Sequence, residues 1–283
     1  MIKSFLKISA GVFFTLASFS IQAQVSGIPA IEKAIFEKDF KKADALLQPI
    51  IKSFINKNKP DSLLNYLFFE GKVTQGKKDI QAGVKAFVSL REKIKSLTND
   101  PGIIRQAYIE EGEFYGSNGM NHQGYEANIQ AKKYVLLMPG RTENYQGLIE
   151  NNLSTFAQRI GDIDLAGKHS RAAIKILTSV KNANPETLYI AYNGMGAMMW
   201  YASKSDSALY YYNKALETLD KAEPTPMNKY FRPSTIQNNL AGLYSIEGNT
   251  TKAIITLNLS LANLRNFITS SGADPKKQSA ILF

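Results

Sequence analysis

The side chains that could carry catalysis or hold a metal ion are few and poorly spaced in this chain. Glu110, Glu111 and Glu113 form a short acidic run, and the chain has two histidines, His122 and His169. Neighbouring positions of a helix point in different directions, so we expect the acidic run to be a solvated face. Neither histidine has a partner at the spacing of a metal site. We expect His122 on a turn and His169 in solvent or at a helix interface.

No other motif points to an enzyme. The sequence contains no cysteine, which excludes disulfides, thiolate zinc sites and cysteine nucleophiles. It also has no glycine-rich phosphate loop, no nucleophile elbow and no arrangement of serine, histidine and aspartate. We therefore expect no catalytic residue, no cofactor and no metal.

Asparagine side chains form the pattern with the clearest binding chemistry. Asn151, Asn193 and Asn238 each precede a small residue by three positions, and Asn152 and Asn239 follow the first and the last of them. A primary amide both donates and accepts hydrogen bonds, so it can pair with a peptide group of an extended ligand. The alternative is that these asparagines cap or cross-link helices inside the fold.

The small residues that set this phase recur along most of the chain. Six of them are separated by 40, 41, 42, 42 and 45 residues, and five have a second small residue twelve positions earlier. The first set is Ala43, Gly83, Gly124, Ala166, Ala208 and Ala253, and the second is Gly71, Gly112, Ser154, Gly196 and Ala241. A glycine inside a helix costs about 1 kcal/mol relative to alanine, which two closely crossing helices would explain. The period predicts an all-α fold, a right-handed α-solenoid of about six antiparallel helix pairs.

The unit from Leu188 to Asp220 resembles the tetratricopeptide repeat (TPR). It has Tyr192, Met195-Gly196 and Met199 on an expected first helix, then Ala208, Tyr212 and Ala215 on a second. Weaker copies in the same register cover most of residues 24–275, which we expect to form the solenoid. The units average about 42 residues and resemble the long repeats of kinesin light chains, whose groove asparagines hold a peptide backbone.

This resemblance implies that the first helix of each pair lines a concave groove. Asn151, Asn152, Asn193, Asn238 and Asn239 would then be ligand contacts. Four further residues fall toward the end of the groove on the same helices: Arg159, Trp200, Tyr201 and Ser245. Aromatic residues at helical spacing also occur in cores, so Trp200 and Tyr201 could pack inside the fold instead.

The N-terminus has the pattern of a secretory signal peptide in residues 1–23. Lys3 and Lys7 precede an apolar stretch from Ile8 to Ile21, and cleavage is expected near Ala23. A membrane anchor is the alternative, but it needs about 20 apolar residues. We expect a periplasmic or secreted protein with no integral membrane segment after cleavage.

The net charge of the chain limits the classes of partner that we expect. Removing Lys3 and Lys7 lowers the formal charge from +10 to +8. An exported protein rarely meets nucleic acid, so acidic partners or an anionic membrane surface are the expected counterparts. A solvated, lysine-rich surface is the alternative explanation of the charge.

Residues 276–283 begin what would be a further, truncated repeat, and they end on Ile281-Leu282-Phe283. We expect a downstream domain in the same polypeptide. Together with the signal peptide and the long units, the string Phe231-Arg232-Pro233 before Ile236 resembles the N-terminal TPR region of bacterial proteins that carry a CHAT domain. That domain is protease-like, but its His and Cys dyad is not identifiable in this sequence.

Two functions follow from these patterns. The first is a non-catalytic scaffold that binds a protein or peptide segment in the groove. The second is a sensor region of an envelope signalling protein, such as a histidine kinase or regulator. Glycan capture by an outer-membrane lipoprotein is disfavoured, since no lipid-accepting cysteine follows the apolar segment.

Overall fold

The computed structural model of the chain describes residues 27–140 and 142–270, and all regular structure in them is helical. The expected signal peptide and the expected truncated repeat lie outside the described residues. The helices are α1 (Ile28–Phe36), α2 (Phe40–Asn56), α3 (Pro60–Leu64), α4 (Leu67–Lys77), α5 (Ile80–Leu97), α6 (Pro101–Ser117), α7 (Asn121–Val135), α8 (Glu143–Ile160), α9 (Ile163–Thr178), α10 (Pro185–Tyr201), α11 (Ser205–Leu219), α12 (Arg232–Ile246) and α13 (Thr250–Ser270). A short π-helical turn, η1 (Met227–Phe231), runs directly into α12.

The chain divides into two compact units. The first unit holds the described residues up to Thr142 together with Thr155–Gly161, and the second holds Glu143–Ser154 and the described residues from Asp162 onward. The helix α8 therefore contributes its N-terminal part to the second unit and its C-terminal part to the first. Each unit is described below by itself.

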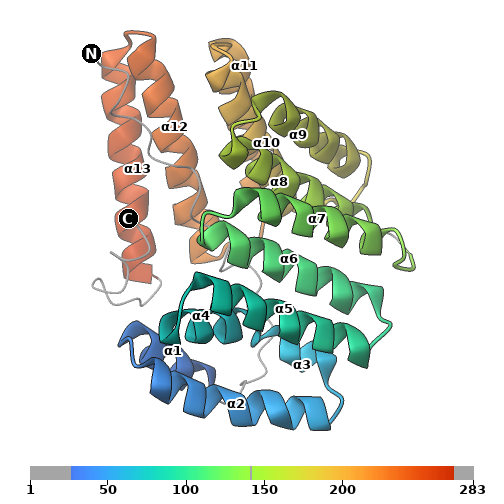
Figure 1. Cartoon of the computed structure of the whole chain (residues 1–283). Coiled ribbons are helices and arrows are strands. Elements are labelled where there is room, and N and C mark those ends of the chain that lie inside the picture. The colour runs from blue at the N-terminus through green and yellow to red at the C-terminus, as the bar shows by residue number, and fades with distance from the viewer. Residues whose placement is uncertain (1–26, 141, 271–283) are drawn as a thin grey trace. The chain divides into compact units, whose positions relative to one another are not determined.

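Helix pairs are the building blocks of both units, as the period predicts. Figure 1 shows α4 beside α5 and α6 beside α7 in the first unit, and α10 beside α11 and α12 beside α13 in the second. Gly119, Gly161 and Gly248 sit in the turns inside three pairs with φ of 73°, 95° and 77°. This left-handed conformation ends helices at little cost in glycine. The short helix α3 is an element that the repeat pattern did not predict.

The paired small residues lie where two helices of a pair cross, as expected. A Cβ added to Gly83 would stand 2.7 Å from the carbonyl oxygen of Gly71, and one added to Gly112 would stand 3.2 Å from that of Gly124. In the third pair the Ser154 hydroxyl donates a 2.9 Å hydrogen bond to the Ala166 carbonyl. The close crossing therefore requires a side chain no larger than serine at these positions.

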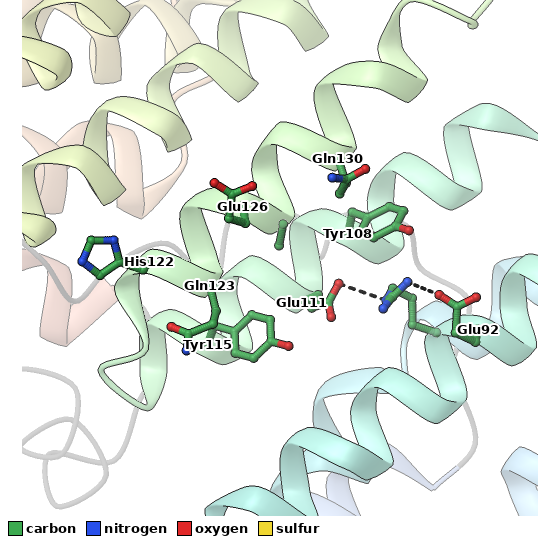
Figure 2. Close-up of a pocket in the computed structure, with 10 residues that line it drawn as sticks. Glu92, Tyr108, Glu111, Tyr115, His122, Gln123, Glu126 and Gln130 are labelled. Carbon is green, nitrogen blue, oxygen red and sulfur yellow. Dashed lines mark hydrogen bonds and ion pairs between the residues drawn. The ribbon is translucent and has the colours of Figure 1, made fainter.

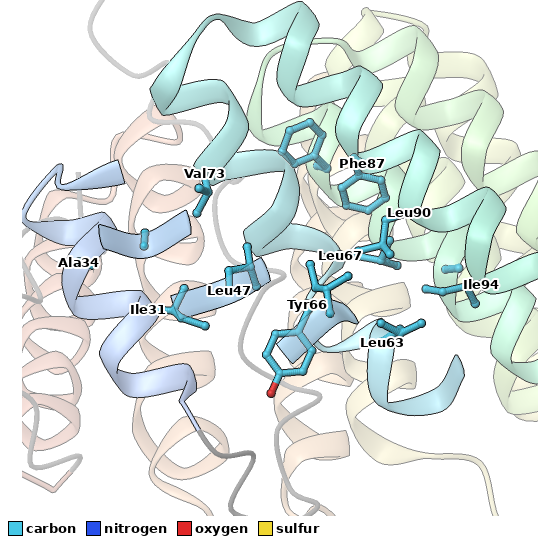
Figure 3. Close-up of a cluster of buried hydrophobic side chains, with 14 residues drawn as sticks. Ile31, Ala34, Leu47, Leu63, Tyr66, Leu67, Val73, Phe87, Leu90 and Ile94 are labelled. Carbon is cyan, nitrogen blue, oxygen red and sulfur yellow. The ribbon is translucent and has the colours of Figure 1, made fainter. Parts of the chain in front are cut away.

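The core of the first unit collects the apolar face of each helix from α1 to α6. Figure 3 shows Leu63 and Tyr66 from α3 and its C-terminal end beside Leu67, Leu90 and Ile94. All five side chains are almost fully buried. The unpredicted helix α3 thus contributes core packing between the first two helix pairs.

The start of α12 is adapted to a proline. Pro233 lies in the first turn of α12, where its missing N–H is tolerated, and the π-helical turn η1 ends just before that turn. Arg232 forms a 3.1 Å ion pair with Glu186 on α10, and its carbonyl oxygen accepts a 3.2 Å hydrogen bond from the Tyr189 hydroxyl. These contacts fix α12 against α10.

Candidate peptide-binding surface

The predicted asparagine positions of the second unit lie on α8, α10 and α12. Asn151 and Asn193 stand one turn before Ser154 and Gly196, and Asn238 has the same position relative to Ala241. Because the small residues fix how each helix rotates against its partner, the three asparagines occupy equivalent positions in successive repeats. Their surroundings nevertheless differ.

Asn151 is buried, with 2% of its surface exposed. Its Nδ2 donates a 2.8 Å hydrogen bond to the Thr187 carbonyl oxygen at the start of α10. Asn152 is buried as well. Asn151 thus cross-links two neighbouring helices, which is the structural role that the sequence left open beside ligand contact. A buried amide bonded in this way stabilises the repeat stack rather than facing a ligand.

Asn193 and Asn238 are more accessible. Asn193 is half-buried and its Oδ1 accepts a 3.3 Å hydrogen bond from Asn239 Nδ2, which joins α10 to α12. Asn238 is exposed. The asparagine pair therefore orients the Asn193 amide, while the Asn238 amide is in contact with solvent.

The aromatic pair at the end of α10 splits between packing and exposure. Trp200 is half-buried, and a Cβ added to Gly242 on α12 would stand 2.9 Å from its Cη2 atom. The indole thus covers a position that only glycine fits. Tyr201 is 65% exposed, and Ser245 on α12 is exposed too. We name the set of Asn193, Tyr201, Asn238, Asn239 and Ser245 the amide surface.

Arg159 belongs to the first unit and has a different environment. Its guanidinium lies 5.5 Å from the centre of the Phe156 ring, and its Nη1 would lie 2.8 Å from a Cβ added to Gly116 on α6. It faces the Glu113 carboxyl. Burial first, and then the neighbouring Glu110, raise the pKa of Glu113 to about 8, against the opposing effect of Arg159.

The prediction of a solvated acidic run is wrong. Glu111 is buried, and its Oε2 lies 2.9 Å from Nε of Arg91 on α5, whose guanidinium also pairs with Glu92. Burial raises the pKa values of Glu110 and Glu111. The repeat phase could have revealed this, because Glu111 directly precedes the small residue Gly112 and so shares the buried side of α6.

The two histidines have different surroundings. His122 is exposed in the first turn of α7. His169 is at a helix interface, where its Nδ1 lies 2.6 Å from Oε2 of Glu150. No group of three potential metal-binding acidic or histidine side chains occurs in residues 27–140 and 142–270. Within the same residues no helix has the length and apolar character needed to cross a bilayer.

The arrangement of the amide surface favours recognition rather than reaction. It combines side-chain amides that both donate and accept, one exposed phenol and one hydroxyl. An extended segment could pair its peptide groups with the amides and place an apolar side chain on the tyrosine. No nucleophile and base stand together there.

Comparisons with known proteins identify the fold. No protein-family profile matches the chain, and no characterised protein has significant sequence similarity to it. The crystal structure of BtubC (BKLC) from P. vanneervenii is similar at a TM-score of 0.58, with 16% identity over 87% of this chain and 94% of that one. A putative kinesin light chain with TPR-like repeats from Podospora anserina has a TM-score of 0.51, with 15% identity over 72% of this chain and 96% of that one.

A third similar structure is a Rap protein complexed with competence and sporulation factor. Its TM-score is 0.53, with 13% identity over 89% of this chain and 83% of that one. The similarities establish a TPR-like helical-repeat fold for the chain, and at these identities they establish the fold alone.

Proposed function

We propose that this chain is a non-catalytic scaffold that binds an extended segment of a protein or peptide on the amide surface of its second unit. The observation that carries the proposal is the set of accessible amides in register on α10 and α12, with Asn193 oriented by Asn239 at 3.3 Å. A fixed amide loses less conformational entropy on binding than a free one. The Rap protein of similar fold, crystallised with competence and sporulation factor, supports the class of function.

A side-chain amide can pair with a peptide group without requiring charge. We therefore expect the surface to recognise the backbone of the ligand rather than its side chains. Tyr201 supplies specificity beside it, as an exposed ring at the end of α10 on which an apolar or aromatic side chain can pack. Asn151, Asn152 and Trp200 support the surface from within, and Arg159 is assigned to the first unit.

The test is a selection of linear peptides from a random display library on the immobilised full chain. The selected peptides are then measured by calorimetry on the wild type and on the double variant Asn193→Ala with Asn238→Ala. We expect at least a tenfold loss of affinity in the double variant, because two amide hydrogen bonds of about 1 kcal/mol each are removed. Glu247→Gln, an exposed change beyond the last turn of α12, is the matched control and leaves the affinity unchanged.

Equal affinity of the selected peptides for the wild type and the double variant would remove the amide surface from the proposal. Selection of peptides that bind only after unfolding, detected by loss of helical circular dichroism, would do the same. Asn151 is excluded from the variant because its buried bond to Thr187 makes its replacement a stability change.

We further propose that the protein is exported, with cleavage near Ala23, and that it is the partner-binding part of a longer polypeptide of the CHAT-containing kind. The support is the pattern of residues 1–23 and the resemblance of the long repeats. Edman sequencing of the protein from its native host tests the first point, and a mature N-terminus at Met1 would contradict it. Reading the coding frame past Phe283 separates a CHAT domain from the alternative, an envelope sensor.

A further inference from the structure

A cavity of about 590 Å³ lies in the first unit, between α5 and α7 and above α6. Figure 2 shows Glu111 and Tyr115 on α6 along its floor, with Glu126 and Gln130 above them on α7 and Glu92 on the far side. The cavity is built from different helices than the amide surface, so it is a separate site. Its lining is polar and aromatic, with few aliphatic groups.

The guanidinium of Arg91, which lines the cavity, is already paired with carboxylates of the lining. Nε of Arg91 lies 2.9 Å from Glu111 Oε2, its Nη1 pairs with Glu92, and the guanidinium stacks 4.5 Å from the centre of the Tyr108 ring. The Tyr115 side chain is hydrogen-bonded to Glu111. Two carboxylates of the lining are therefore ion-paired with Arg91, although its buried Nε–H makes no well-aligned hydrogen bond.

The hydrogen-bond acceptors on α7, at the opposite wall of the cavity, lack a partner among the described residues. Among the described residues, the carboxylate of Glu126 and the amide of Gln123 form no hydrogen bond or ion pair, and both side chains are exposed. In the same part of the chain, Tyr115 has no aromatic or cation–π partner, although Tyr108 has Arg91 on its ring and Tyr134 stacked at 5.7 Å. The cavity thus offers a free carboxylate, a free amide oxygen and the Tyr115 ring.

We propose that this cavity binds a guanidinium group, presented as an arginine side chain of a partner polypeptide. An excess of free acceptors selects a donor, and a carboxylate selects a cationic one. A guanidinium suits the lining better than an ammonium, because it is planar, weakly hydrated and able to stack on a tyrosine while its edge bonds Glu126 and Gln123. The cavity volume accommodates the whole side chain together with water.

The charge of the whole chain makes the site selective rather than incidental. The chain has a formal net charge of +10, so a cationic ligand is repelled by most of its surface. Along the lining, Glu92 and Glu111 are balanced by Arg91 and by Lys95, whose Nζ lies 3.2 Å from Glu92 Oε1, so among the described residues Glu126 is the carboxylate left without a counter-charge. Attraction confined to one cavity directs an arginine to it, and added salt weakens that attraction.

The experiment uses the full chain and the probe peptide acetyl-Gly-Arg-Gly-amide, titrated by nuclear magnetic resonance with amide signals assigned. We expect saturable binding in the millimolar range, with the largest shifts in α6 and α7. The citrulline counterpart has nearly the same shape without the charge, and we expect it to bind at least tenfold more weakly. The lysine counterpart is expected to be at least threefold weaker than the arginine peptide.

Variants localise the binding. Glu126→Gln keeps the size of an exposed side chain, and we expect it to weaken the arginine peptide at least fivefold while helical circular dichroism is unchanged. Glu126→Lys is expected to abolish binding. Glu247→Gln in the second unit is the matched control, and Asn193→Ala with Asn238→Ala leaves this binding intact. Failure of the amide surface and failure of the cavity are thereby distinguished.

Equal binding of the arginine and citrulline peptides would overturn the proposal, as would unchanged binding to Glu126→Gln. Ethylguanidinium is the remaining probe. If it binds as tightly as the tripeptide, the polypeptide origin of the group is contradicted and a small guanidinium compound takes its place. Binding of the tripeptide at least threefold tighter supports a polypeptide partner.

Discussion

The two units place opposite chemistry at the same positions of the repeat. Three residues before the small residue, the first unit has Phe68 and Ile109, whereas the second has asparagine in all three of its repeats. Directly before the small residue the first unit has Glu70 and Glu111, whereas the second has Leu153, Met195 and Leu240. The small residue thus fixes how the helices pack, and the adjoining positions remain free to carry charge, amide or apolar groups.

This difference separates two ways of using a buried position. In the first unit Glu111 carries charge into the helix interface and is matched by Arg91 at 2.9 Å. In the second unit the equivalent positions are apolar, and asparagine stands two residues earlier in each repeat. We infer that, at the position directly before the small residue, the first unit is the more sensitive to loss of a charge and the second to loss of a shape.

The largest expected effect comes from breaking the ion pair of the first unit. Glu111→Gln leaves Arg91 without its buried counter-charge and with only the exposed Glu92 as a partner, and we expect the free energy of unfolding to fall by about 3 kcal/mol. Urea denaturation monitored by circular dichroism measures it. Glu92→Gln removes the other, exposed partner of Arg91, and a change above about 1 kcal/mol there would contradict the distinction between buried and exposed pairs.

The next effect tests shape in the second unit. Gly196→Ala puts a methyl group 2.6 Å from the Tyr212 ring, so we expect a loss of about 2 kcal/mol despite the better helix propensity of alanine. The control is Gly194→Ala in the same helix, where the nearest atom is Ser170 Oγ at 3.4 Å. This variant is expected to gain roughly 0.5 kcal/mol. Equal effects of the two would refute the helix crossing.

These two variants also mark how far the sequence predicts the fold. The period of small residues predicts the helix pairs, their turns and the crossing at Gly196, because each depends on local spacing. The spacing within the acidic run does not predict the burial of Glu111, whereas its position directly before Gly112 does. The helix α3 was missed because it belongs to no repeat.

The sequence predicts the positions of the asparagines of the candidate site, but not which of them are exposed. Asn151 and Asn193 have the same phase, yet one bonds the Thr187 carbonyl and the other the Asn239 amide. The hydrogen-bond partner of each asparagine depends on the residue that the following repeat places next to it. The sequence of one helix does not determine that residue. Trp200 and Tyr201 likewise differ because Gly242 gives room to only one of them.

A smaller effect depends on pH in the first unit. The pKa of Glu113 is about 8 in the folded chain, against an ordinary value of 4.5, because of burial and the nearby Glu110. The folded state therefore holds a proton that the unfolded state releases between about pH 4.5 and 8, so the stability that this group contributes falls as the pH rises through that range. The repeats of the second unit have Ala197 and Gly242 at this position.

Urea denaturation at pH 5 and pH 8 compares the wild type with Glu113→Gln. We expect the two to be similarly stable at pH 5 and the variant to be more stable at pH 8, by at least about 1 kcal/mol. A wild type that loses no more stability than the variant between these two pH values would contradict the assignment.

The smallest effect compares two asparagines of the amide series. Asn151→Ala removes a buried hydrogen bond and is expected to cost about 1 kcal/mol of unfolding free energy. Asn238→Ala changes an exposed side chain and is expected to shift it by less than about 0.5 kcal/mol. Thermal denaturation measures the stability of both variants. A larger loss of stability in Asn238→Ala than in Asn151→Ala would reverse the structural and ligand-binding roles given to the two residues.

Hydrogen exchange of the full chain, with and without a selected peptide, tests the central claim most directly. If the amide surface binds the peptide backbone, backbone amides of α10 and α12 become more protected, and those of α11 and α13 change little. The Asn193→Ala and Asn238→Ala double variant then shows no added protection at the same peptide concentration. Protection confined to α11 and α13, or retained in the double variant, would contradict the account.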